Sequence, residues 1–141
     1  MGIPTLAALV RARKTLDEMK ASQELWIGGG LSKGGDFAKA LALGADAVFV
    51  AFPLMVAMGC TYCRLCYLGK CPVGIATQDE VLRKKLDIEA APHIASFIKN
   101  CTEEIKMVAG AVGKNNIHDL TTEDLRALTS EMAKLTGTKF I

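Results

Sequence analysis

Only two runs in this 141-residue chain have the character of buried β-strands, and this limits what it can fold into. They are ELWIGGG, residues 24–30, and ADAVFVAF, residues 45–52. The apolar spacing predicts a helix from Thr5 to Met19, and DFAKALALG predicts a second helix with Asp36 as its cap and Gly44 as its stop. Strands and helices that alternate at this spacing indicate right-handed crossovers, so we expect an α/β fold with a parallel sheet.

Beyond Thr77 the sequence predicts helices only. One helix of about five turns ends at Gly113, because apolar residues recur every three or four positions before it. The same spacing from Leu125 to Leu135, after Thr121 as a cap, predicts another helix. We therefore expect three segments: a partial barrel over 1–58, a cysteine loop over 59–78 and a helical extension over 79–141.

Composition excludes several classes of protein. Half of the residues are apolar and the formal net charge is +2, which indicates neither disorder nor binding to nucleic acid. The longest mostly apolar stretch, residues 45–58, contains Asp46 and Pro53 and is shorter than the roughly 20 residues that cross a bilayer. The N-terminus has no secretory pattern, so we expect a cytoplasmic protein without a membrane segment, whose clustered cysteines serve metal or redox chemistry.

A glycine-rich run follows the first expected strand. Gly28, Gly29 and Gly30 end that strand, and Gly34 and Gly35 stand just before the next helix. Glycine allows close approach of the backbone to a ligand, and helix N-termini bind phosphate. The first three glycines are therefore candidates for cofactor binding. A tight strand-to-helix turn explains them equally well.

Four cysteines form the most specific motif of the chain. Cys60, Cys63, Cys66 and Cys71 have the spacing C-x2-C-x2-C-x4-C and are followed by proline, close to the run that holds ferredoxin-type iron–sulfur clusters. Zinc is the alternative, but zinc sites usually take two CxxC pairs separated by a longer loop. The spacing favours an iron–sulfur cluster. Cys101, on the apolar face of its helix, is expected to be an ordinary core residue.

Two long runs of the sequence resemble a known family. GGGLSKGGDFAKALALGADAV and MGCTYCRLCYLGKCPVGIATQD are similar to the FMN-binding barrel domain of glutamate synthase, particularly the archaeal type, as are GIPTLAALVRA and HDLTTEDLRAL. The resemblance implies the C-terminal part of a (β/α)₈ barrel with about two parallel strands, followed by an iron–sulfur cysteine loop and a helical tail. It also implies that the cluster passes electrons to FMN, which reduces 2-iminoglutarate to glutamate.

The family pattern assigns the cluster ligands only in part. Its three ligands follow C-x5-C-x4-C, which falls on Cys60, Cys66 and Cys71, whereas Cys63 is additional. Three thiolates are enough for a [3Fe–4S] cluster, and a fourth ligand at Cys63 favours [4Fe–4S]. Cys63→Ser distinguishes the two, because only the loss of a ligand should produce the EPR signal of an oxidised [3Fe–4S] cluster.

Two departures from the family limit the expected activity. Roughly six barrel strands and the catalytic groups that they carry have no counterpart, since such a domain takes about 250 residues. Ala51 and Phe52 stand where the family tends to have Gly-Thr at the flavin phosphate. We expect the isolated chain to be inactive and to associate with itself or with a chain that supplies the missing strands, and to receive electrons from a donor protein. The alternative is a non-catalytic assembly module that bears a cluster or zinc.

Overall fold

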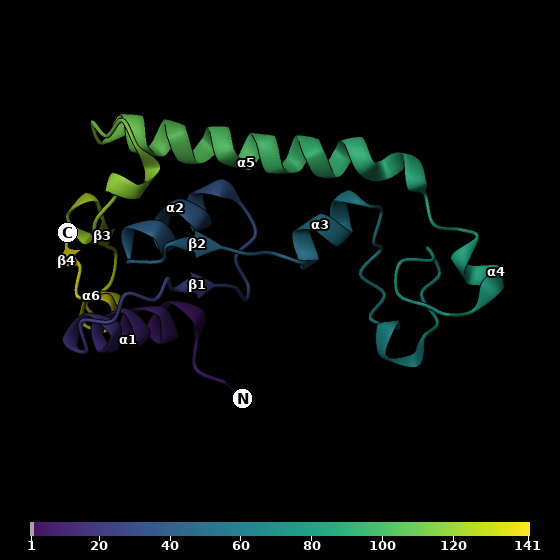
Figure 1. Ribbon diagram of the computed structural model, residues 1–141, viewed down its shortest axis with the longest axis horizontal. Coiled ribbons are helices and arrows are strands. Elements are labelled where there is room, and N and C mark those ends of the chain that lie inside the picture. Colours follow the sequence, from purple (N-terminus) through teal and green to yellow (C-terminus); the bar gives the residue numbers. More distant parts are fainter. Residues whose placement is uncertain (1) are drawn as a thin grey trace. The chain divides into compact units, whose positions relative to one another are not determined.

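The computed structural model describes residues 2–141, which divide into two compact units (Figure 1). The first unit contains the residues up to Val50 together with Cys101–Ile141, and the second contains Ala51–Asn100. Helix α5, Ala91–Ala111, begins in the second unit and ends in the first. The expected division at 58 and 78 remains a prediction.

The N-terminal part of the first unit has the predicted α/β order. Helix α1 (Thr5–Glu18) is followed by β1 (Trp26–Ile27), α2 (Gly34–Ala42) and β2 (Ala47–Val48). The two strands pair in parallel, with Trp26 beside Ala47 and Ile27 beside Val48. The parallel arrangement is confirmed. Each strand, however, is only two residues long, because glycines bend the chain after β1 and a further helix begins soon after β2.

The core of this unit lies between the first two helices and the strand pair (Figure 1). Leu9 of α1 is completely buried and packs with Ala40 and Leu43 of α2. Partly buried apolar residues from α1, the two strands and the C-terminal segment surround this cluster: Leu6, Val10, Leu25, Ile27, Leu31, Val48 and Leu125. The spacing that predicted amphipathic helices therefore identified the faces that form this core.

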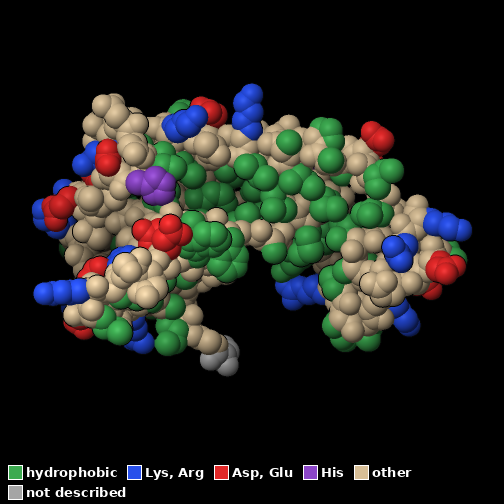
Figure 2. All heavy atoms as spheres, viewed as in Figure 1, with side chains coloured by type: hydrophobic (Ala, Val, Ile, Leu, Met, Phe, Trp, Pro, Cys, Tyr) green, Lys and Arg blue, Asp and Glu red, His purple; other side chains and the backbone are tan. Residues whose placement is uncertain are grey.

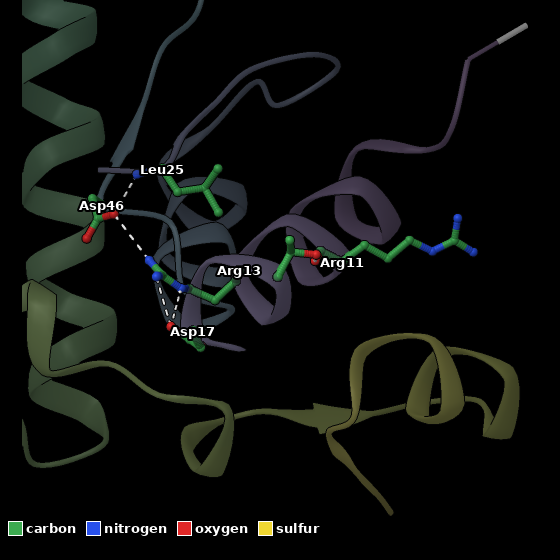
Figure 3. A network of polar contacts seen from close by, with 6 residues as sticks. Arg11, Arg13, Asp17, Leu25 and Asp46 are labelled. Carbon is green, nitrogen blue, oxygen red and sulfur yellow. Dashed lines mark hydrogen bonds and ion pairs between the residues drawn. The ribbon is translucent and has the colours of Figure 1, made fainter. Parts of the chain in front are cut away.

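A polar network ties α1 to the chain around the strands (Figure 3). Asp46 accepts a hydrogen bond of 2.7 Å from the backbone N–H of Leu25 and lies 3.5 Å from a guanidinium nitrogen of Arg13. Arg13 also pairs with Asp17 one turn along α1, at 2.8 Å. Figure 3 shows Arg11 pointing away from this network. Arg13 thus holds the strand pair against α1.

The C-terminal part of the first unit differs from the prediction. The prediction of a single helix over Leu125–Leu135 is wrong. The prediction that only helices follow Thr77 is also wrong. A 3₁₀ turn at Thr122–Asp124 precedes β3 (Arg126–Ala127), α6 (Ser130–Thr136) and β4 (Lys139–Phe140), and β3 pairs in parallel with β4. Two separate caps explain the break. Thr121 and Asp124 form a capping box for the 3₁₀ turn, and the Thr129 side chain accepts from the Met132 N–H to start α6.

The second unit is built from short helices and loops. It contains α3 (Phe52–Ala57), a 3₁₀ turn at Cys66–Leu68, α4 (Glu80–Arg83), another 3₁₀ turn at Ile88–Ala90 and the first half of α5. The long C-terminal helix is confirmed as α5, whose buried face includes Cys101, Ile105 and Ala109. Helix α3 was not predicted; its residues lie partly in the apolar run that was assigned to the second strand.

No closed barrel occurs among residues 2–141, which contain two separate two-stranded sheets. That the β1–β2 pair is the C-terminal part of a (β/α)₈ barrel remains a prediction. Over the same described residues, no helix has the length and apolar character needed to span a bilayer.

Candidate metal centre

The four clustered cysteines lie in the second unit, just after α3. Cys60 is half-buried, Cys63 and Cys66 are exposed, and Cys71 is buried, with 3% of its surface exposed. All four are free thiols. Across residues 2–141, no three side chains of the Cys, His, Asp and Glu types lie close enough together to hold one metal ion. The fold alone therefore brings the candidate ligands into one loop without gathering their sulfur atoms.

Cys71 lies in a backbone environment that favours a thiolate. The N–H of Ala76 lowers the pKa of the Cys71 thiol, and the N–H groups of Val73, Ile75 and Gly74 act in the same direction. Burial opposes them, but the net shift of the pKa is downward. Because the thiolate is the form that binds iron or zinc, this turn prepares Cys71 to act as a ligand.

Contacts on both sides hold the turn after Cys71 in place. Gly74 has φ +78°, and a Cβ built on it would lie 2.7 Å from the carbonyl oxygen of Leu82, so only glycine fits against the end of α4. The Thr77 hydroxyl donates to the carbonyl of Gly69, which closes the segment that contains Cys71. Asp79 then caps α4 by accepting from two backbone N–H groups at 2.9 Å. These contacts therefore fix the conformation of the turn that contains Cys71.

The segment around Cys63 is strained instead. Tyr62 and Arg64 have φ of 57° and 58°, a left-handed conformation that costs an L-residue about 1–2 kcal/mol. The Tyr62 ring contacts the Phe52 ring, with centroids 4.9 Å apart, and the Arg64 guanidinium lies 4.6 Å from the Tyr62 centroid. These two contacts together contribute roughly 1–2.5 kcal/mol, less than or similar to the strain of two such residues. These contacts therefore offset much of the strain and hold the conformation, but they leave the loop little net stability.

The donor set fits a metal bound by thiolates. A metal bound there would add stabilisation to the loop, because ligand binding and loop order are coupled. Cys71 is buried and hydrogen-bonded, whereas Cys60 is half-buried and Cys63 and Cys66 are exposed, so Cys71 would be the most firmly placed ligand of such a site. Both an iron–sulfur cluster and tetrahedral zinc are compatible with four thiolates.

The glycines assigned to cofactor binding already have partners within the first unit. A Cβ on Gly28 would lie 2.7 Å from the ring of Phe49, so that ring covers the glycine. The carbonyl of Gly29 accepts a 2.7 Å hydrogen bond from the Thr5 hydroxyl. Around Gly30, a Cβ would meet no atom within 4 Å. Of the three, only Gly30 leaves open space for a ligand, and cofactor binding by this run remains a prediction.

Carboxylates occupy the N-terminus of α2. The backbone N–H of Gly34 donates to Glu104 at 2.9 Å, and Asp36 of the first helical turn accepts from the backbone N–H of Ser32 at 3.2 Å. A phosphate at this helix end would meet two negative charges, so the arrangement fits the phosphate of FMN poorly. Asp36 does not cap the helix as predicted; Lys33 stands at the N-cap position and makes no side-chain capping hydrogen bond.

Sequence reasoning missed Glu104 and the Phe52–Tyr62 contact. Glu104 lies 70 positions after its partner in the sequence, and no local pattern links them. Cys101 was placed correctly in the core: it is 8% exposed, and burial together with the charge of Glu104 raises the pKa of its thiol. That thiol is therefore unsuited to metal binding.

Comparison with known proteins gives a consistent assignment. Residues 1–115 match the family model described as a conserved region in glutamate synthase. An archaeal glutamate synthase (NADPH) of Methanocaldococcus jannaschii is 44% identical over 85% of this chain and 24% of its own length. A glutamate synthase large subunit-like protein of Rhizobium meliloti is 40% identical over 96% of this chain and 35% of its own length. An archaeal-type glutamate synthase (NADPH) of Dehalococcoides mccartyi is 36% identical over 99% of this chain and 29% of its own length.

The chain therefore spans about a quarter to a third of these relatives. The family match extends from the N-terminus through the glycine run, the cysteine loop and α5. It covers well over half of the sequence and agrees with the resemblance carried by the cysteine block. The chain belongs to the glutamate synthase family.

Proposed function

We propose that this chain carries an iron–sulfur cluster and serves as the electron-transfer part of a glutamate-synthase-like flavoenzyme. The observation that supports this most strongly is the turn after Cys71, where four backbone N–H groups favour a thiolate at a buried position. Cys60, Cys66 and Cys71 are the proposed ligands, and Cys63 is proposed as a fourth ligand of a [4Fe–4S] cluster. A bound cluster would supply one-electron transfer.

Within the proposed enzyme, the electrons go to FMN and serve the reduction of 2-iminoglutarate to glutamate. That reduction consumes two electrons, delivered as a hydride, and one proton. The residues of this chain contribute the thiolates and the turns that orient them. The internal partners of Gly28, Gly29 and Gly34 leave little of the glycine run free for a phosphate, so FMN is proposed to be bound mainly by other parts of the enzyme.

A partner chain, or a second copy of this chain, is proposed to complete the sheet that β1 and β2 begin. Each of these strands has a neighbour on one side only, and Trp26 of β1 and Phe49 just after β2 are 60% and 59% exposed. Figure 2 shows hydrophobic side chains exposed on the face drawn there. Large apolar side chains exposed beside an open sheet edge are typical of an interface. An electron-donor protein is the second proposed partner.

The alternative function is a non-catalytic assembly module that bears a cluster or a zinc ion and needs a partner chain. It is supported by the four clustered free cysteines, because four thiolates also suit a tetrahedral structural zinc site. Zinc gives no visible absorption, whereas an iron–sulfur cluster is brown and flavin adds yellow. Absorption spectra of anaerobically purified protein, with iron, zinc and sulfide analysis, therefore separate the electron-transfer function from the zinc-bearing form of the alternative. Zinc in place of iron and sulfide would reject the electron-transfer proposal.

A further inference from the structure

Three side chains meet beside Cys63 in the second unit. Phe52, the first residue of α3, contacts the ring of Tyr62, with 4.9 Å between centroids and planes inclined at 56°. The guanidinium of Arg64 lies 4.6 Å from the Tyr62 centroid and donates a hydrogen bond to the Tyr62 hydroxyl. Two of the three residues immediately flank Cys63 in the sequence. The three therefore connect the start of α3 to the middle of the cysteine loop.

The residues on both sides of Cys63 have the conformation that L-amino acids usually avoid. Tyr62 has φ 57° and Arg64 has φ 58°, whereas the other left-handed residues of this loop and its flanks are glycines. A left-handed tyrosine and arginine persist only where contacts outside the backbone hold them. The ring contact and the guanidinium contact are interactions of that kind.

We propose that Phe52, Tyr62 and Arg64 form a clamp that holds residues 62–64 in this conformation and so positions Cys63 for metal binding. The metal-binding part of this inference rests on the proposed function. Phe52 contributes the side of the clamp that belongs to α3, and both Phe52 and Arg64 contact the Tyr62 ring. The three are positioning residues, since each acts on Cys63 through the backbone.

The same loop contains a matched control. Tyr67 lies one residue after Cys66 and is 83% exposed, compared with 56% for Tyr62 and 41% for Phe52. Among residues 2–141, the ring contact between Phe52 and Tyr62 does not extend to Tyr67. Replacing Tyr67 therefore removes an aromatic side chain from the loop and leaves the clamp intact.

The test compares Phe52→Leu, Phe52→Tyr and Tyr67→Leu with the unmodified chain, each reconstituted anaerobically with iron and sulfide. The measured quantity is the rate at which a chelator removes iron. Loss of the ring contact in Phe52→Leu should accelerate iron loss about three- to tenfold, the change expected for one aromatic pair. Phe52→Tyr keeps a ring and should restore the original rate, and Tyr67→Leu should leave it unchanged. Equal rates for Phe52→Leu and the unmodified chain would overturn the clamp.

A second readout needs no metal. Trypsin cleaves after arginine only when the surrounding backbone can adopt an extended conformation, so the clamp should protect the bond after Arg64 in the metal-free chain. Phe52→Leu should speed this cleavage several-fold, measured by mass spectrometry, with Tyr67→Leu as the control. If the unmodified chain takes up no cluster, the proposed function fails and the cleavage rates still decide on the clamp. Unchanged cleavage after Arg64 in Phe52→Leu would contradict it.

Discussion

The backbone N–H of Gly34 donates a hydrogen bond to the carboxylate of Glu104, with 2.9 Å between nitrogen and oxygen. The bond joins the first residue of α2 to the C-terminal half of α5 within the first unit. It also places a negative charge at the helix end that glycine-rich turns commonly offer to phosphate. This contact decides both how α5 is anchored and how well the glycine run suits an anion.

Gly34→Ala should destabilise the first unit. The added Cβ would lie 2.7 Å from the backbone oxygen of Cys101 and from the side chain of Glu104, so α5 must shift away from α2. Overpacking of this kind costs roughly 1–3 kcal/mol of unfolding free energy. Chemical denaturation followed by circular dichroism measures the change.

Gly110→Ala is the control for that substitution. Gly110 also lies in a helix, α5, but a Cβ there meets no atom within 4 Å. Alanine favours helix over glycine by about 1 kcal/mol, so this variant should be as stable as the parent or more stable. Equal effects of the two substitutions would contradict the close approach of α5 to Gly34.

Substitutions of Glu104 should separate its hydrogen bond from its charge. Glu104→Ala leaves the Gly34 N–H without its partner and should cost about 0.5–2 kcal/mol of unfolding free energy, as the loss of a helix cap does. Glu104→Gln keeps an oxygen acceptor and loses only the interaction with the helix dipole, a smaller effect. Urea denaturation of the three proteins tests this order. If Glu104→Gln lowers the unfolding free energy more than Glu104→Ala does, the hydrogen bond to Gly34 is not the main contribution of Glu104 to stability.

Leu9→Ala should strongly lower the unfolding free energy of the first unit. Leu9 is completely buried between α1 and α2, and truncation of such a leucine costs roughly 2–5 kcal/mol. Leu128, which is 77% exposed, is the matched control, and Leu128→Ala should change the unfolding free energy by less than about 0.5 kcal/mol. Thermal unfolding of both variants tests the assignment of the core.

The sequence predicted those parts of the fold that depend on local patterns. The helices α1, α2 and α5 follow from apolar spacing, and the parallel pairing of β1 with β2 follows from the alternation of strands and helices. The prediction of one helix over residues 125–135 failed for a physical reason. These residues keep helical spacing, but separate caps at Thr121 and Thr129 divide the segment into a 3₁₀ turn and α6. Spacing alone does not detect such a division.

At the candidate site, the sequence identified the cysteines but not what surrounds them. The motif specified four thiols in one loop, and it could not show that Cys71 alone is buried among backbone N–H groups. Phe52 was interpreted only as a lost phosphate contact, whereas in the structure its ring contacts Tyr62. Long-range contacts such as Gly34 with Glu104 have no signature in one sequence.

Acid should weaken the C-terminal part of the first unit through Glu123. The hydrogen bond and charge of Lys139 hold the pKa of the Glu123 carboxyl below its usual range. Because the pKa is lower in the folded state, this stabilisation is present above the unfolded-state pKa and is lost as the pH falls through the folded-state pKa. Both side chains are exposed, so the effect is small.

Glu123→Gln isolates this contribution. The variant should have a slightly lower melting temperature than the parent at neutral pH, and the difference should vanish once the pH is below the folded-state pKa of Glu123. Melting curves recorded from neutral pH to pH 2 measure it. A difference that grows in acid would contradict the pairing with Lys139.

The central claim, that the cysteine loop holds an iron–sulfur cluster, is tested most directly by anaerobic reconstitution followed by iron and sulfide analysis and EPR spectroscopy. The unmodified chain should take up iron and sulfide, and Cys60→Ser, Cys66→Ser and Cys71→Ser should each lose the cluster, whereas Cys101→Ser should keep it. Cys63→Ser should yield the oxidised [3Fe–4S] signal if Cys63 is the fourth ligand. A chain that binds no iron and sulfide, or that retains them after Cys71→Ser, would contradict the account.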